Sequence, residues 1–160
     1  MLNREASTRD HDWIAAHIPH AGRMCLLDRV AAWDPHHVLC TVTSHRLPDH
    51  PLRQFGRLGA ACGVEYAAQA MAVHGALLAG ADADRIGRPG MLVGMRGVTL
   101  HVARLDDVAE TLLVRAQRLG SSDAMLLYGF SISAGDRTLL DGRASVLLAS
   151  APDRSTNPNR

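Results

Sequence analysis

Two polar side chains in this sequence, one histidine and one glutamate, could carry out acid–base chemistry together. His20 follows Pro19 directly, at the start of a loop. An imidazole can accept or donate a proton near neutral pH, and the proline restricts the backbone before it. Glu65 lies in an apolar stretch with helical spacing. The residue types predict that His20 acts as a general base and Glu65 as a general acid.

The surroundings of Glu65 indicate how its carboxyl group could be tuned. The neighbours Val64, Ala67 and Ala68 leave little polar surface on the expected helix. Burial raises the pKa of a carboxyl group, so we expect Glu65 to be protonated and able to donate. Gln69 lies one helical turn further on and could orient the carboxyl group. The alternatives are a surface histidine and a glutamate that reaches solvent, as most helical glutamates do.

The elements that must position this pair follow from hydrophobic periodicity. A short helical turn is predicted at 13–18, because Pro19 must end it. A longer helix is predicted at 60–79, with Gly80 as its stop. Strands are predicted at 24–30, 37–43, 98–102, 112–116, 126–132 and 144–148, with a tight turn at Gly135. Strands that follow one another without helices between them favour an antiparallel sheet, so the fold class is α+β.

Length and charge limit the possible classes of protein. The 160 residues suit one domain, predicted at 10–150, with disordered polar tails at 1–9 and 151–160. A net charge of +1 with scattered arginines argues against a nucleic-acid partner. The stretch 58–81 contains Glu65, Gln69 and His74, which favours a buried helix over a membrane span. Residues 1–12 contain no apolar run of a secretory signal.

Cysteine and histidine usage predicts neither a disulfide framework nor a metal site. Cys25, Cys40 and Cys62 are odd in number and lack the paired spacing of metal ligands. The histidines at positions 36, 37, 45 and 50 also lack the regular offsets of metal sites, so we expect them to be solvated. Reduced thiols predict a cytoplasmic location.

Two motifs in the chain resemble those of the hotdog-fold 3-hydroxyacyl-acyl-carrier-protein dehydratases. The first is Pro-His-x-x-x-Met-x-Leu-Leu-Asp-Arg, which starts at Pro19, and the second is Glu-Tyr-x-Ala-Gln-Ala, which starts at Glu65. The Gly-His-Phe-Pro and Pro-Gly segments of the main fatty-acid dehydratases are replaced here by residues 50–59. The chain is therefore more similar to the divergent dehydratase-like branch of aryl polyene pigment synthesis.

This resemblance implies a hotdog fold, in which an antiparallel sheet wraps a long central helix. It also implies a homodimer, whose active sites take the histidine and the carboxylate from different subunits. The implied reaction is loss of water from a 3-hydroxyacyl thioester on acyl carrier protein, with no other cofactor. His20 would remove the C2 proton, and Glu65 would protonate the C3 hydroxyl group.

The resemblance also implies substrate-binding positions near the start of the helix. A backbone N–H there, at Ala60 or at the nearby Gly59 or Gly63, would polarise the thioester carbonyl. Gln69 would complete the site. Arg23, Arg53 and Arg57 flank it in the sequence and could attract the carrier protein or its phosphopantetheine.

Two other functions stay open at this point. Hotdog thioesterases also use a helix carboxylate, in their case to activate water. The missing Gly-His-Phe-Pro segment is also consistent with a non-catalytic acyl-binding protein, or with the partner of an active dehydratase in a heterodimer.

Overall fold

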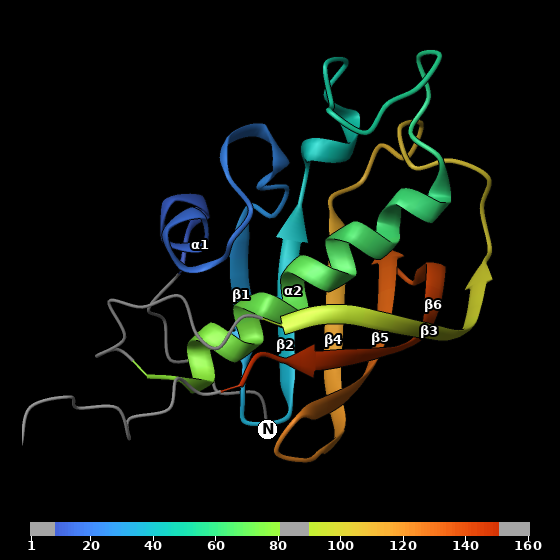
Figure 1. The fold of residues 1–160 in the computed structure, drawn as a ribbon. Coiled ribbons are helices and arrows are strands. Elements are labelled where there is room, and N and C mark those ends of the chain that lie inside the picture. The colour runs from blue at the N-terminus through green and yellow to red at the C-terminus, as the bar shows by residue number, and fades with distance from the viewer. Residues whose placement is uncertain (1–8, 81–89, 151–160) are drawn as a thin grey trace, which may run out of the picture.

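An antiparallel sheet crossed by one long helix forms the body of the protein (Figure 1). The computed structural model describes residues 9–80 and 90–150, and in this part of the chain the sheet has six strands. The helices and strands are α1 (His11–His17), β1 (Arg29–Trp33), β2 (His37–Val42), α2 (Gly63–Leu78), β3 (Gly90–Leu100), β4 (Leu112–Ser121), β5 (Met125–Ala134) and β6 (Arg137–Leu148). The strand order is β1-β2-β4-β5-β6-β3, so the last pairing joins β6 back to β3. The α+β prediction is confirmed.

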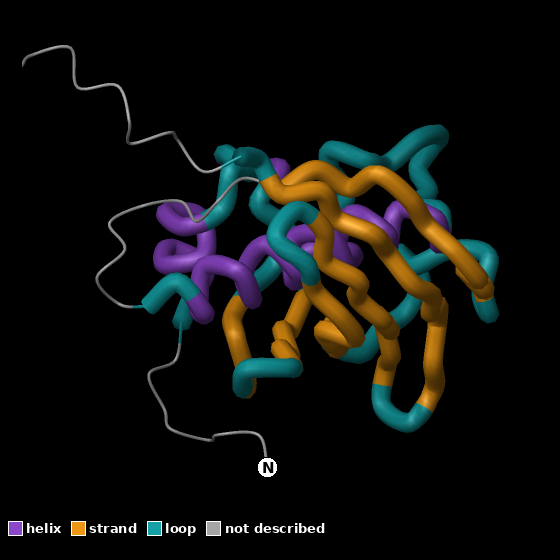
Figure 2. The backbone as a smooth tube through the Cα atoms, turned by 60° about the horizontal axis from the view of Figure 1, so that its bottom comes forward, coloured by secondary structure: helices purple, strands orange, loops and turns teal. Residues whose placement is uncertain are grey.

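Alternating side chains place the core between the sheet and α2. Val38, Cys40 and Val42 of β2 are fully buried, as are Leu112 and Val114 of β4. The residues between them point to the other face of the sheet. This alternation with a period of two is expected for a sheet that is covered on one side. Helix α2 contacts β2, β4 and β5, and Figure 2 shows it lying against the strands.

The long helix is confirmed, with a change of geometry at its start. A 3₁₀ turn, Ala60–Cys62, leads directly into α2, and Gly80 follows the helix with a φ of +90°. Gly63 allows α2 to approach the sheet closely, because a Cβ there would lie 2.7 Å from a methyl carbon of Leu140. A left-handed residue such as Gly80 is a common helix stop.

Two predicted strands differ from the structure. Most of 24–30 is not strand: a 3₁₀ turn, Gly22–Met24, is followed by extended chain, and β1 begins only at Arg29. The reason is that side chains, rather than a neighbouring strand, bind the backbone of Leu26. Its N–H donates to the Gln69 side chain, and its carbonyl accepts from the Ser44 hydroxyl group. The strand predicted at 98–102 is the end of the longer β3, which stops at Leu100.

The remaining predictions on chain organisation concern the ends and the membrane. The tails predicted at 1–9 and 151–160 lie outside the described residues, apart from Arg9, whose carbonyl accepts a hydrogen bond from Val30 N–H. In the described part of the chain, no helix combines the length and apolar character that a membrane crossing requires.

Candidate functional site

His20 and Glu65 lie in contact at the N-terminal end of α2. The distance from His20 Nε2 to Glu65 Oε1 is 3.0 Å, and the two side chains are 26% and 33% exposed. In this structure both belong to the same chain, whereas the resemblance implies one group from each subunit. The pair is therefore assembled within one protomer, where it is protected but still reachable by solvent.

The pKa of Glu65 is shifted in the direction opposite to the one expected from burial. The hydrogen bond from His20 is the largest cause and lowers the pKa of Glu65, while burial acts in the other direction and Gln69 lowers it further. The prediction of a carboxyl group kept protonated by burial is thus wrong. At neutral pH, Glu65 is a carboxylate that accepts a hydrogen bond from His20.

The second ring nitrogen of His20 has an unusual environment. Nδ1 is buried and has no hydrogen-bond partner in the described part of the chain. A buried ring nitrogen is normally satisfied, so this atom is an exception that calls for a functional explanation.

Gln69 holds Glu65 and the segment after the His20 loop in place. Its amide nitrogen donates to Met24 O (2.6 Å) and to Glu65 Oε1 (3.2 Å), and its oxygen accepts from Leu26 N–H (2.9 Å). The side chain is fully buried. Gln69 thus contacts the carboxylate of Glu65, as an orienting residue would, while its role in substrate binding stays a prediction.

Sequence reasoning missed a second buried network behind the pair. His50 Nδ1 accepts from Leu52 N–H (3.1 Å), so its Nε2–H donates to the Tyr66 hydroxyl (2.8 Å). The Tyr66 hydroxyl lies 3.0 Å from Ser44 Oγ, which donates to Leu26 O. Tyr66 directly follows Glu65 in the sequence, and this position on the helix was the signal from which the network could have been found. His50, expected to be solvated, is instead buried.

The start of the helix offers one backbone donor, at a position the sequence did not single out. The Ala60 N–H donates to Ala103 O (3.1 Å), and Gly63 packs against Leu140. The backbone N–H groups of Ala60 and Gly63 are both engaged within the chain, and the roles of these residues in binding a carbonyl stay predictions. The N–H of Ala61 donates to no group in the described residues, and Ala61 precedes Glu65 by one helical turn. The N–H of Ala61 therefore points out of the N-terminal end of the helix, close in sequence to Glu65.

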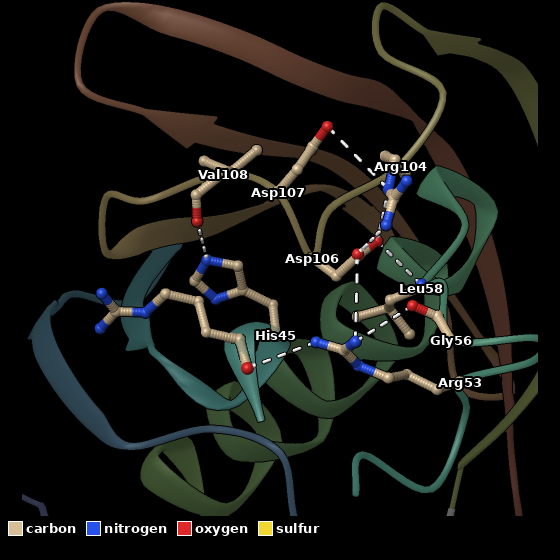
Figure 3. Close-up of polar contacts among 9 residues, drawn as sticks. His45, Arg53, Gly56, Leu58, Arg104, Asp106, Asp107 and Val108 are labelled. Carbon is tan, nitrogen blue, oxygen red and sulfur yellow. Dashed lines mark hydrogen bonds and ion pairs between the residues drawn. The ribbon is translucent and has the colours of Figure 1, made fainter. Parts of the chain in front are cut away.

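A charged network fixes the loop that leads into the helix (Figure 3). Asp106, whose side chain is 5% exposed, accepts hydrogen bonds from Leu58 N–H (2.9 Å) and Arg104 Nε (2.9 Å). Arg53 donates to Gly56 O and lies 4.0 Å from Asp106. The Arg104 guanidinium lowers the pKa of Asp106. These contacts hold the chain rigidly just before the residues that form the site.

The loop held by this network ends in a strained turn. Phe55 and Gly56 have φ angles of +52° and +72°, and Gln54 and Arg57 form two backbone hydrogen bonds around them. Positive φ at both central residues is the pattern of a type I′ turn, in which asparagine and glycine are preferred. Phe55 is fully exposed there. A hollow of about 510 Å³ lies beside the turn, lined by Phe55, Arg57 and Cys62 among others.

The arginines and histidines singled out in the sequence have different environments. Arg23 pairs with Asp49 (2.9 Å), whereas the side chain of Arg57 has no hydrogen bond or ion pair within the described ranges. His37 contacts Asp34, and His45 is buried against Val108 O. In the described residues, no three histidine, cysteine or acidic side chains gather as a metal ion would require.

Comparisons with known proteins agree with this geometry. The dehydratase heterocomplex ApeI:P from Xenorhabdus doucetiae has a chain that matches with a TM-score of 0.74 and 26% identity, covering 86% of this chain and 91% of that one. Zebrafish thioesterase superfamily member 2 matches at 17% identity with a TM-score of 0.62, covering 93% of this chain and 100% of that one. The Mus musculus protein of the same name matches at 14% identity with a TM-score of 0.54, covering 75% of this chain and 80% of that one. These likenesses confirm the hotdog fold.

A search of curated proteins found no match. The family model for ApeP-like proteins, described as ApeP dehydratase, matches residues 13–157. This range contains His20, Glu65, Gln69 and the whole sheet. The chain therefore belongs to the ApeP-like dehydratase family.

Proposed function

We propose that this protein dehydrates 3-hydroxyacyl thioesters carried on acyl carrier protein, in the cytoplasm, during the synthesis of fatty-acid-like or aryl polyene chains. The observation that carries the proposal is the 3.0 Å contact between His20 Nε2 and Glu65 Oε1 in a member of a dehydratase family. Elimination of water needs one group to remove a proton and another to supply one, and this pair contains both. The phosphopantetheine of the carrier protein is the only prosthetic group required.

In the proposed cycle, Glu65 begins as a carboxylate that accepts a hydrogen bond from the proton on His20 Nε2. Transfer of the Nε2 proton to Oε1 leaves a bare Nε2 and a protonated carboxyl group. Nε2 then takes the C2 proton while the C2–C3 double bond forms, and Glu65 protonates the C3 hydroxyl group, which leaves as water. The pair returns to its starting protonation state. The N–H of Ala61 polarises the thioester carbonyl as negative charge develops on its oxygen.

One observation favours thioester hydrolysis as a second candidate. The lowered pKa of Glu65 keeps it ionised at neutral pH, and an ionised carboxylate can take a proton from an attacking water molecule. Hydrolysis releases a free thiol, whereas dehydration leaves the thioester intact. The two reactions are therefore distinguishable by their products.

We also propose that the working unit is a dimer joined through β3, with either a second copy or a paralogue. Strand β3 is an edge of the sheet, and its exposed apolar residues include Met91, Val93 and Leu100. An unpaired apolar edge is a template for adding another strand. The related ApeI:P structure is a heterocomplex. The third possibility, a non-catalytic subunit, would use the same edge.

The assembly is tested by light scattering after size exclusion. Val93→Lys places a charge on the edge strand and should prevent dimer formation, either alone or with a co-expressed paralogue. Leu47→Lys, at an exposed loop leucine, is the matched control and should leave the assembly unchanged. A dimer that persists in Val93→Lys would rule out this edge as the interface.

The reaction is tested with an enoyl thioester on carrier protein. Hydration removes the absorbance of the conjugated system, and a thiol reagent reports any hydrolysis. The dehydratase proposal expects loss of absorbance without thiol release. Thiol release from a saturated acyl thioester would instead support the thioesterase. Inactivity, both alone and with a paralogous subunit, would leave the non-catalytic role.

A further inference from the structure

A hollow of about 560 Å³ opens on the face of the sheet that points away from α2. Its lining includes Arg115 and Gln117, which alternate along β4 with the buried Val114 and Ala116. Since α2 covers the buried face, the hollow lies on the opposite side of the sheet. Neither His20 nor Glu65 lines it, so it is separate from the proposed catalytic site.

Three arginine side chains give the hollow a positive charge. Arg96, Arg115 and Arg143 line it, and none of their side chains forms a hydrogen bond or ion pair with any residue in the described ranges 9–80 and 90–150. Asp141 also lines it, but its carboxylate pairs with His101 Nε2 at 2.8 Å. Arg96 and Arg143 are direct cross-strand partners. Like charges directly opposite one another destabilise a sheet, so the protein retains an unfavourable pair here.

The backbone around the hollow is also unfavourable for a sheet. Gly129 lies in the middle of β5, directly opposite Arg143, and leaves the floor without a side chain. The pairing of β3 with β6 is irregular between Arg96 and Thr99, where Gly97 has a φ of +57°. Strand glycines mark close approaches, and bulges redirect side chains. Both features act together with the arginines to form an open cationic hollow.

We propose that this hollow binds an anion of the phosphate class, either free or carried on a small organic molecule. Guanidinium groups bind phosphate through paired hydrogen bonds, and the unpaired arginines supply several such groups. The volume lies within the range of small-molecule sites and exceeds what a single phosphate ion fills. Leu119, 46% exposed on the lining, offers an apolar contact to an organic group.

Isothermal titration calorimetry with inorganic phosphate, pyrophosphate and ADP tests the site on the intact protein. We expect at least one probe to bind with a Kd of about 1 mM or tighter. Arg143→Gln should weaken binding about tenfold or more, because it removes a charged donor. Arg137→Gln is the matched control on the same strand: it changes the charge equally, at an exposed position outside the hollow, and should preserve the affinity.

Gly129→Val separates a built site from general attraction to positive charge. A Cβ at Gly129 meets its nearest neighbour, Leu119 Cδ1, at 3.5 Å, so the side chain fits but fills the floor. All arginines remain, yet binding should fall about tenfold or more. Tighter binding of ADP than of pyrophosphate would identify the ligand as a phosphate carried on an organic molecule. Equal binding of the two probes would identify it as a free phosphate. No binding of any probe, or unchanged binding in Gly129→Val with the fold intact by circular dichroism, would overturn the proposal.

Discussion

At the scale of single residues, a partner decides the protonation of Glu65. The carboxylate is only partly buried, and the hydrogen bond from His20 outweighs the desolvation that burial causes. The resemblance of the two motifs implied that His20 and Glu65 act as a pair, although from different subunits. The sequence did not allow the direction of the pKa shift to be predicted, because that depends on a 3.0 Å contact rather than on the apolar character of the helix.

Removing His20 should therefore raise the pKa of Glu65. In His20→Ala the largest lowering cause is lost while the desolvation remains. Carboxyl ¹³C NMR titration measures the change. His17→Ala is the control, since His17 binds Trp13 O in α1 and should leave the titration of Glu65 unchanged. An unaltered Glu65 titration in His20→Ala would show that the contact does not set its charge.

Replacing Phe55 by a residue that tolerates positive φ should make the protein more stable. Its φ of +52° costs an L-residue about 1 to 2 kcal/mol, and its full exposure means that no packing is lost on replacement. Phe55→Asn should raise the free energy of unfolding by about 1 kcal/mol, as measured by urea denaturation. Phe55→Leu keeps the strain and should give no gain. If Phe55→Asn proved less stable than the wild type, the turn would not be strained.

At the scale of elements, strands with a period of two were predictable and the segment before β1 was not. Strands β2, β4 and β5 bury alternate residues against α2, and that pattern is visible in the sequence. The segment 24–28 is apolar as well, but the side chains of Gln69 and Ser44 bind its backbone. Such contacts link residues far apart in the chain, so no local pattern reveals them.

The two glycines of α2 should respond differently to alanine. Gly75 has open space around the missing Cβ, so Gly75→Ala should stabilise the protein by about 1 kcal/mol through helix propensity. At Gly63 a Cβ would lie 2.7 Å and 2.8 Å from the two methyl carbons of Leu140. Overpacking costs about 1 to 3 kcal/mol, so Gly63→Ala should give a net loss. Urea unfolding compares both variants, and equal gains would contradict close packing at Gly63.

At the scale of the whole molecule, three buried histidines make stability depend on pH. Burial lowers the pKa of His45, His50 and His74 below the ordinary value of about 6.5. Below that value the unfolded chain binds more protons than the folded one, so stability present above about pH 6.5 is lost as the pH falls. Urea unfolding between about pH 7.5 and 5.5 measures the loss.

The control for this prediction is a substitution at His101, whose side chain is about half exposed beside Asp141. His74→Asn should reduce the pH dependence of the free energy of unfolding, whereas His101→Asn should leave the contribution of the buried histidines in place. Stability that did not change between these pH values would show that the buried rings are not held neutral.

The whole-molecule arrangement was only partly predictable. An α+β fold followed from one helix and a run of strands, while the hotdog fold rested on the resemblance of two motifs. The pairing of β3 with β6, and the hollow that this pairing helps to form, depend on contacts between distant parts of the chain. The opposition of Arg96 and Arg143 is set by a register that no sequence pattern specified.

The most direct test of the central claim is the loss of water from a 3-hydroxyacyl chain on carrier protein, followed by intact-protein mass spectrometry. Wild-type protein, with its paralogous subunit if required, should convert the chain to the enoyl product. His20→Ala and Glu65→Gln should each slow this step by about 10² to 10⁴, with circular dichroism unchanged. Wild-type rates of water loss in either variant would contradict the assignment of dehydration to the His20–Glu65 pair.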